Sequence, residues 1–417
     1  MGKGTHMRAR VSRFMSRRAM SVAAIDQALS SGSNFLIALF VARTLDLDSL
    51  GGYAVAFAVF ALSVELSRAI GAEALAIRIS SIDAHRGVDG VVSAAVLVGV
   101  CAAVVSAGLR AAFDGAIGDA MSMMVIFVPF AVVQDSLRSA FITIGVPGRA
   151  LFSDAVWIAV QAITLIWLLN ESAPGAGHAV AAWGAAAAVA TTVSVAVFDV
   201  EVRPRHAFSW LAAHRDIWPR LLGEAVVRAG LTQVTFIVVA AIVGSGEFGR
   251  LRAAQIIFGP ASMALLLAPL IAVPEAARQT TVEGIRTVGR VTSISLVGVV
   301  TAVMAVALVI PSGLGEFVLG DNWTEAQGLL PVTGAILGAN ALVAGAMASL
   351  RGAGRVDLTL RLWSFSGPLV LLSSAIAALF GIAAAAGAVA GSGLTLAVLS
   401  WYFVRTDAIA PQVASAG

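Results

Sequence analysis

Long apolar segments recur along the chain, and twelve of them are long enough to cross a lipid bilayer as helices. About 20 residues of helix span the hydrocarbon layer. The continuous apolar run from residue 358 to 403 is twice that length, so we place a break at Gly381. The predicted spans are 21–45, 50–76, 90–113, 119–142, 151–169, 177–198, 219–243, 248–272, 288–311, 325–348, 358–380 and 382–403. The pattern predicts an all-α polytopic membrane protein.

The first predicted span, residues 21–45, is unusually polar in its first half. Asp26, Ser30, Ser33 and Asn34 follow the i, i+4, i+7, i+8 spacing that places side chains on one helix face. Lipid cannot solvate such a face, because the hydrocarbon offers no hydrogen-bonding partner. We therefore expect this face to look into a bundle interior or a water-filled cavity.

The layout of the first span returns 198 positions later, where Glu224 takes the place of Asp26 and Gly249 that of Gly51. Two similar halves around a site near the midplane are a common plan in transporters. We predict two six-helix bundles around a central cavity, at 21–200 and 219–404. Between them we expect a cytoplasmic amphipathic linker, 201–218, and outside them cytoplasmic tails, 1–20 and 405–417.

Composition supports a membrane protein and excludes several kinds of site. The 417 residues are 59% hydrophobic and 12% charged, whereas about a quarter of a soluble domain is charged. The one cysteine, Cys101, lies in an apolar span, which excludes a disulfide framework and a cysteine-based metal site. HExxH, CxxC and glycine-rich phosphate motifs are absent from the sequence. We expect no cofactor, no metal and no nucleic-acid partner.

The distribution of basic residues predicts the orientation of the chain. With the N-terminus inside, 20 of the 27 basic residues fall on the cytoplasmic side, 4 on the outer side and the rest within spans. Basic residues accumulate on the cytoplasmic side of membrane proteins. We therefore expect both termini in the cytoplasm of a bacterium and the spans in its plasma membrane.

Three predicted spans carry a carboxylate followed by an arginine at helical spacing. Charges inside a membrane are costly and by default mark a substrate or ion path. A pair at i, i+3 or i, i+4 can also neutralise itself on one helix and act only in folding. The three pairs are Glu65 with Arg68, Asp135 with Arg138, and Glu224 with Arg228.

One stretch after the first span follows the pattern AR-x-L-…-(F/L)G-x-Y, with Ala42, Arg43, Leu45, Leu50, Gly51 and Tyr53. Two further segments, Val132–Gln161 and Arg250–Met263, carry the same likeness. In all three segments the chain resembles the actinobacterial Wzx-like polysaccharide exporters of the MOP flippase superfamily. The matching polar positions in the second segment are Gln134, Asp135, Arg138 and Asp154. The resemblance implies a V-shaped pair of bundles whose central cavity moves a lipid-linked oligosaccharide to the outer leaflet.

The leading hypothesis is a flippase for a polyprenyl-(pyro)phosphate-linked glycan, working by alternating access. Arginine suits a pyrophosphate through bidentate hydrogen bonds. The expected partners are this glycan, membrane lipid, and a glycan polymerase or glycosyltransferases. Substrate-binding candidates are Arg68, Arg138, Arg228, Asn34, Gln134 and Gln233. Candidates for holding the arginines or carrying a coupling ion are Asp26, Glu65, Asp135 and Glu224.

Three other functions stay open. In a multidrug antiporter of the MATE type, from the same superfamily, Asp26 would accept a proton or sodium in a cavity for organic cations. A membrane glycan enzyme is disfavoured, since such enzymes usually need a sizeable outer domain and the predicted outer loops are short. The third alternative is a scaffold that transports nothing itself and recruits the enzymes of glycan synthesis.

Overall fold

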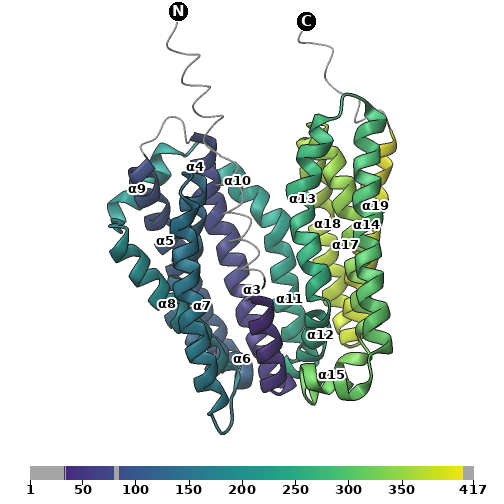
Figure 1. The fold of residues 1–417 in the computed structure, drawn as a ribbon, viewed down its shortest axis with the longest axis horizontal. Helices are drawn as coiled ribbons and strands as arrows, with labels where there is room; N and C mark the ends of the chain where they lie inside the picture. The colour runs from purple at the N-terminus through teal and green to yellow at the C-terminus, as the bar shows by residue number, and fades with distance from the viewer. Residues whose placement is uncertain (1–31, 33, 79–83, 407–417) are drawn as a thin grey trace, which may run out of the picture. The chain divides into compact units, whose positions relative to one another are not determined.

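The computed structural model describes residue 32 and residues 34–78 and 84–406, which form helices and short connections (Figure 1). Eleven helices within these residues are long and apolar enough to cross a membrane, and a shorter apolar helix covers Asn34–Thr44. The described residues contain no strand. The prediction of an all-α protein with about twelve spans is therefore confirmed, although about half of the predicted span 21–45 lies outside the described residues.

The chain divides into two compact units. Of the described residues, those before Ala38 and those within Gly52–Gly230 form unit 1, and those within Ala38–Gly51 and from Leu231 onward form unit 2. The helices from the first unit are α3 (Leu47–Ile70, whose first five residues belong to unit 2), α4 (Ala72–Arg78), α5 (Ala84–Ala112), α6 (Gly115–Thr143), α7 (Pro147–Leu169), α8 (Ala176–Val197), α9 (Pro204–Ala213), α10 (Trp218–Ala225) and the π-helix η1 (Val226–Gly230).

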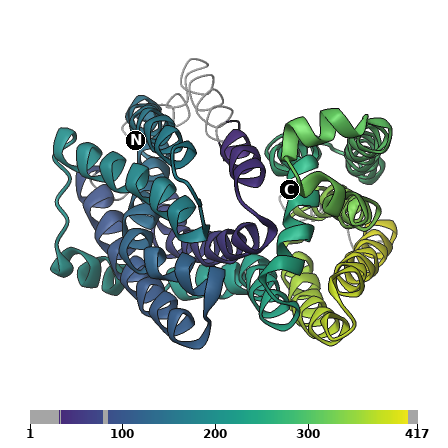
Figure 2. The ribbon, with the colours of Figure 1, turned by 90° about the horizontal axis from the view of Figure 1, so that it is seen from below.

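The first full helix of unit 2, α11, follows directly on η1, the last element of unit 1. Its helices are α11 (Leu231–Val243), α12 (Ser245–Ile257), α13 (Gly259–Arg278), α14 (Val282–Val309), α15 (Ser312–Leu319), α16 (Asn322–Gln327), α17 (Leu330–Gly352), α18 (Val356–Ala378) and α19 (Ile382–Arg405). Figure 2 looks along the helices of each unit. In unit 1, α6 packs against α5, α7 and α8; in unit 2, α17 packs against α13, α14 and α19.

Most predicted spans match helices to within a few residues, and the predicted break at Gly381 is confirmed. Gly381 caps α19 with φ +104°, a backbone conformation that is open to glycine and strained for other residues. The predicted span 248–272 is wrong in one respect, because the structure divides it at Phe258 into α12 and α13. Pro260 lies in the first turn of α13, where its missing N–H costs nothing, whereas inside a continuous helix it would remove a hydrogen bond.

The predicted linker holds the short helix α9, which is amphipathic as expected. Ala207 and Trp210 are buried in unit 1, whereas Phe208 on the other face is 63% exposed. Because α9 packs on α5, the linker is part of the folded unit rather than a free connection.

The two halves of the sequence repeat meet in unit 2, where the start of α3 crosses the start of α12. A Cβ atom added to Gly51 would collide with the carbonyl oxygen of Ser245, and one added to Gly249 would collide with that of Leu47. Leu47 and Ser245 are related by the same 198-residue offset as Gly51 and Gly249. The contact is therefore reciprocal, like one across a two-fold axis, and it depends on two glycines that let the backbones touch.

We expect Gly249→Ala to destabilise unit 2 by about 1–3 kcal/mol, as overpacking does elsewhere. The added methyl group meets backbone atoms, which cannot rotate away. The measurement is the thermal unfolding of the purified protein in detergent. Gly246→Ala, one turn earlier in α12, is the matched control, because its Cβ would make only an ordinary contact of 3.8 Å with Asp48 Oδ1. Equal stability of the two variants would contradict this account.

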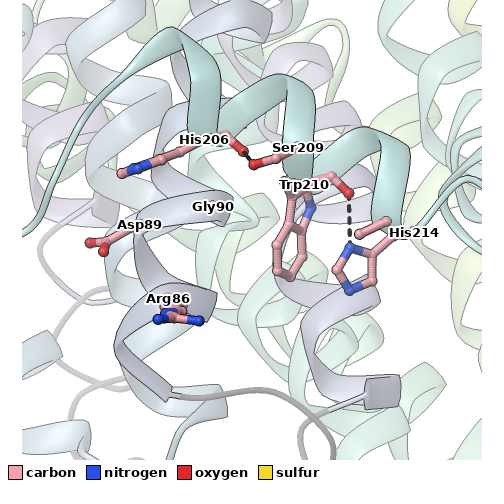
Figure 3. Close-up of a pocket in the computed structure, with 8 residues that line it drawn as sticks. Arg86, Asp89, Gly90, His206, Ser209, Trp210 and His214 are labelled. Carbon is pink, nitrogen blue, oxygen red and sulfur yellow. Dashed lines mark hydrogen bonds between the residues drawn. The ribbon is translucent and has the colours of Figure 1, made fainter.

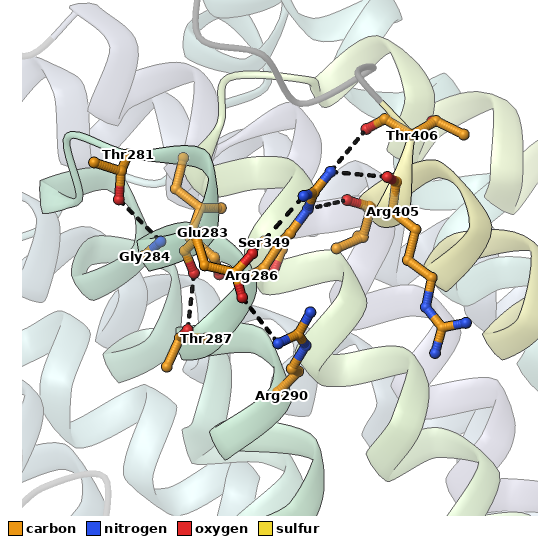
Figure 4. A network of polar contacts seen from close by, with 11 residues as sticks. Thr281, Glu283, Gly284, Arg286, Thr287, Arg290, Ser349, Arg405 and Thr406 are labelled. Atoms are coloured by element: carbon orange, nitrogen blue, oxygen red, sulfur yellow. Dashed lines mark hydrogen bonds and ion pairs between the residues drawn. The ribbon is translucent and has the colours of Figure 1, made fainter.

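Arg286 on α14 closes the C-terminal end of α19 (Figure 4). Its Nε donates to the carbonyl of Val404 at 3.0 Å, and its Nη2 donates to that of Arg405 at 2.8 Å. These carbonyls lie in the last turn of the helix, where no intrahelical partner remains for them. Arg286 thus ties the last helix of unit 2 to α14.

Arg286→Ala is expected to destabilise unit 2 by about 1.5–3 kcal/mol, the range for hydrogen bonds to a charged group. Arg290→Ala should have little effect, since Arg290 pairs with Glu283 at the surface. Hydrogen–deuterium exchange of α19 reports the difference. Unchanged exchange in Arg286→Ala would show that the cap is dispensable.

Candidate functional site

The membrane-embedded charges of unit 1 form a cluster on α3, α6 and η1. Arg68 on α3 binds Asp135 on α6 through two hydrogen bonds, Nε to Oδ2 at 2.8 Å and Nη2 to Oδ1 at 2.6 Å. This is the bidentate arrangement in which a guanidinium and a carboxylate interact most strongly. A hydrogen bond of 2.8 Å between the hydroxyls of Ser67 and Ser136 lies between the same helices.

Glu65 links Arg68 to a second arginine, Arg228. Arg228 Nη2 donates to Glu65 Oε2 at 2.9 Å, and Glu65 Oε1 lies 3.9 Å from Arg68 Nη1. The side chains of Arg68 and Arg228 are 35% and 33% exposed. One carboxylate therefore lies between two accessible guanidinium groups.

Arg228 is carried by η1, a single π-helical turn between α10 and α11. Such π-bulges occur inside α-helices and are frequent at functional sites. Unit 1 ends at Gly230, so the irregular turn also lies at the point where the chain passes into unit 2.

The pairing differs from the same-helix pairs suggested by the sequence. Asp135 binds Arg68, Arg138 binds Asp154 on α7, and Arg228 binds Glu65, so these ion pairs join different helices. Of the three same-helix pairs, Glu65 with Arg68 is present, at 3.9 Å. Side chains from facing helices can meet end to end, which allows a shorter and better-aligned pair than a reach along one helix.

Arg138 is buried in the interior of unit 1, whereas Arg68 and Arg228 are partly exposed. Its Nε is 3.0 Å from Asp154 Oδ2, and the two side chains are only 9% and 7% exposed. Gln134 is also buried and donates to Asp154 Oδ1 at 3.0 Å. This burial argues against Arg138 and Gln134 as substrate contacts and favours a role in joining α6 to α7.

The remaining candidates are not partners in these ion pairs. Asn34 is exposed in the helix Asn34–Thr44, and Glu224 is half-buried on α10. Gln233 is half-buried on α11 and belongs to unit 2, whereas Asn34 and Glu224 belong to unit 1. Asp26 lies outside the described residues.

Among the described residues, carboxylates outnumber guanidinium groups around the cluster. Glu73, at the start of α4, interacts electrostatically with Glu65, Arg68, Glu224 and Arg228. With Asp135, the group holds four carboxylates and two guanidinium groups. Within the part of the chain that the structure describes, no group of three or more His, Cys, Asp or Glu side chains could hold a metal ion.

Three polar contacts in the structure were not predicted from the sequence. Asp154 stood out only as a polar position in the resemblance, and its pairing with Arg138 needed the packing of α6 on α7. Asn322 Nδ2 donates to the carbonyls of Ala42 and Leu45 at 2.6 and 2.8 Å. Arg43 donates to the carbonyl of Phe317 at 2.6 Å, so this part of the AR-x-L pattern has a structural role within unit 2.

Comparison with known proteins shows which fold this is. No protein-family model and no curated protein matches the chain. Solved structures do match. An inward-facing multidrug resistance MATE transporter of the MOP superfamily has a TM-score of 0.65 at 14% identity, covering 95% of this chain and 100% of that one.

Two further structures share the fold. The lipid II flippase MurJ in an inward closed conformation has a TM-score of 0.70 at 12% identity, with 92% of this chain and 87% of that one covered. A MOP superfamily transporter from Pyrococcus furiosus has a TM-score of 0.55 at 14% identity, with 94% and 95% covered. At these identities the likeness concerns the fold. The chain is thus a multi-pass, all-α membrane protein with the fold of the MOP superfamily transporters.

Proposed function

We propose that the protein is a flippase that moves a polyprenyl-(pyro)phosphate-linked oligosaccharide from the inner to the outer leaflet of the bacterial plasma membrane, for cell-surface polysaccharide synthesis. One observation carries the proposal: Glu65 lies between Arg68 and Arg228, both about one-third exposed. A pyrophosphate offers oxygens to both guanidinium groups at once, with the bidentate geometry that arginine prefers.

When the substrate is absent, Glu65 would then be the anion that pairs with Arg68 and Arg228. An unpaired arginine inside the membrane costs about 2.5–3.5 kcal/mol on insertion scales, so each arginine needs a partner or water. Arrival of the pyrophosphate frees Glu65 from the arginines, and its departure restores the pairs. Because Arg228 lies at the end of unit 1, this exchange gives two arrangements of the bundles different energies with and without substrate, as alternating access requires.

A second function is favoured by a different observation. The excess of carboxylates around the cluster suits a cation, as in an antiporter that exchanges organic cations for H⁺ or Na⁺. The fold supports both functions equally, since one structural relative is a MATE transporter and another a lipid flippase.

Reconstituted proteoliposomes separate the two functions. A fluorescent polyprenyl-pyrophosphate oligosaccharide is placed in both leaflets, and its accessibility to an external quencher is followed over time. In parallel, ethidium movement is followed under a proton or sodium gradient. Flipping of the lipid-linked glycan, with no gradient-driven ethidium transport, is the expected result. Ethidium transport without glycan flipping would overturn the flippase proposal in favour of the antiporter.

A further inference from the structure

A cavity of about 370 Å³ lies in unit 1 between α9 and the first turns of α5 (Figure 3). Arg86, Asp89 and Gly90 line it from α5, and His206, Trp210 and His214 line it from α9 and the residue that follows. None of these residues belongs to the arginine cluster of the transport site. The volume is within the range of small-molecule sites, about 300–1,000 Å³.

Trp210 and His214 form a fixed wall of this cavity. The indole of Trp210 packs directly across Gly90, where a Cβ atom would lie 2.5 Å from the ring, and its Nε1 donates to the carbonyl of Ile70 at 3.0 Å. The ring of His214 stacks on the indole at 3.9 Å between centroids. Both side chains are buried, so the wall is in place before any ligand arrives.

His214 presents a hydrogen-bond acceptor when its ring is neutral. Its Nδ1 lies 2.9 Å from the carbonyl of Trp210. Because a carbonyl only accepts, Nδ1 carries the hydrogen, and Nε2 of the neutral ring has the free lone pair.

Two of the described lining residues carry fixed charges, the cation Arg86 and the anion Asp89. Arg86 and Asp89 are three residues apart on α5, so they lie one above the other on the same face. Asp89 Oδ1 accepts from the backbone N–H of Glu201 at 2.9 Å, which holds the carboxylate in position. Opposite charges one helical turn apart match a zwitterion better than a simple anion.

The location matches the headgroup layer of a membrane. Phe208 and Arg205 point to the exposed face of α9, away from buried Trp210, as in helices that lie in the interface. The arginine distribution predicts that the ends of the helices beside this cavity face the cytoplasm. We propose that the cavity binds the phosphoethanolamine headgroup of a zwitterionic phospholipid, with the phosphate on Arg86 and the ammonium on Asp89.

Native mass spectrometry of the purified full-length protein tests this assignment. Dioleoyl phosphatidylethanolamine and dioleoyl phosphatidylglycerol are titrated separately, and the bound lipid is counted. We expect phosphatidylethanolamine to be retained roughly tenfold better, as one extra charged hydrogen bond would give. Arg86→Gln should weaken retention of both lipids. Asp89→Asn, which keeps an oxygen for the Glu201 N–H, should remove only the preference for ethanolamine.

Controls make the result decisive. Arg205→Ala, on the exposed face of α9, should leave the preference unchanged, which separates the cavity from general attraction to basic residues. Thermal unfolding of each variant shows that it is folded. Soluble phosphoethanolamine should compete with the lipid. The proposal is overturned if phosphatidylglycerol binds wild type equally well, if inorganic phosphate competes as strongly as phosphoethanolamine, or if Asp89→Asn keeps the preference.

Discussion

We expect Arg228→Ala to slow flipping of the proposed lipid-linked glycan while the protein reaches the membrane in normal amount. Arg228 is one-third exposed and shares Glu65 with Arg68, so its removal leaves a folded cluster with one guanidinium group fewer for the pyrophosphate. Each hydrogen bond between charged partners contributes about 1.5–3 kcal/mol. We therefore expect a loss of at least about tenfold in rate, measured in proteoliposomes at equal protein content.

Matched variants define what this result means. Arg220→Ala, at an exposed position on α10, should flip the glycan at the normal rate. Arg228→Lys keeps the charge but not the fork-shaped donor set, so it should recover only part of the activity. If Arg228→Ala reaches the membrane and flips the glycan as fast as wild type, then the link between Arg228 and Glu65 is structural and the proposed exchange of anions is wrong.

We expect Arg138→Ala to have a large effect of a different kind, because it leaves Asp154 charged in the interior of unit 1. Breaking a buried ion pair by removing one partner costs about 3–5 kcal/mol, most of it from the charge left behind. We expect a strong fall in the amount of folded protein, measured by size-exclusion chromatography of a fluorescent fusion. The flipping rate per folded molecule should stay close to wild type.

The double variant Arg138→Leu with Asp154→Leu distinguishes burial from substrate binding. Replacing both partners with apolar side chains of similar volume is often neutral, since no charge is left without a partner. We expect it to recover most of the folded protein and to keep flipping activity. A double variant that folds but does not flip the glycan would return Arg138 to the transport site.

These two arginines show where reasoning from sequence stops. Both follow a carboxylate at helical spacing inside an apolar span, so along the chain they look alike. Only the packing of α6 against α7 places Arg138 beside Asp154, and only η1 brings Arg228 to Glu65. Spacing along one helix shows which face a side chain shares, but not which neighbouring helix covers that face.

Hydropathy alone determined the class of protein, the positions of most spans and the break at Gly381. It succeeds because the bilayer imposes a minimum apolar length and forces each backbone to satisfy its own hydrogen bonds as a helix. The repeat of 198 residues was visible for the same reason, as a layout of polar turns and glycines. Two of those glycines, Gly51 and Gly249, meet in unit 2.

Tertiary structure decided the pairing of charges and therefore the candidate site. An arginine in a span needs a partner, but carboxylates on its own helix and on its neighbours compete for it, and the shorter, better-aligned pair prevails. That choice depends on helix packing to within an ångström or two, which hydropathy does not encode. For the same reason, the separation of exposed Arg68 and Arg228 from buried Arg138 emerged only when the helices were placed side by side.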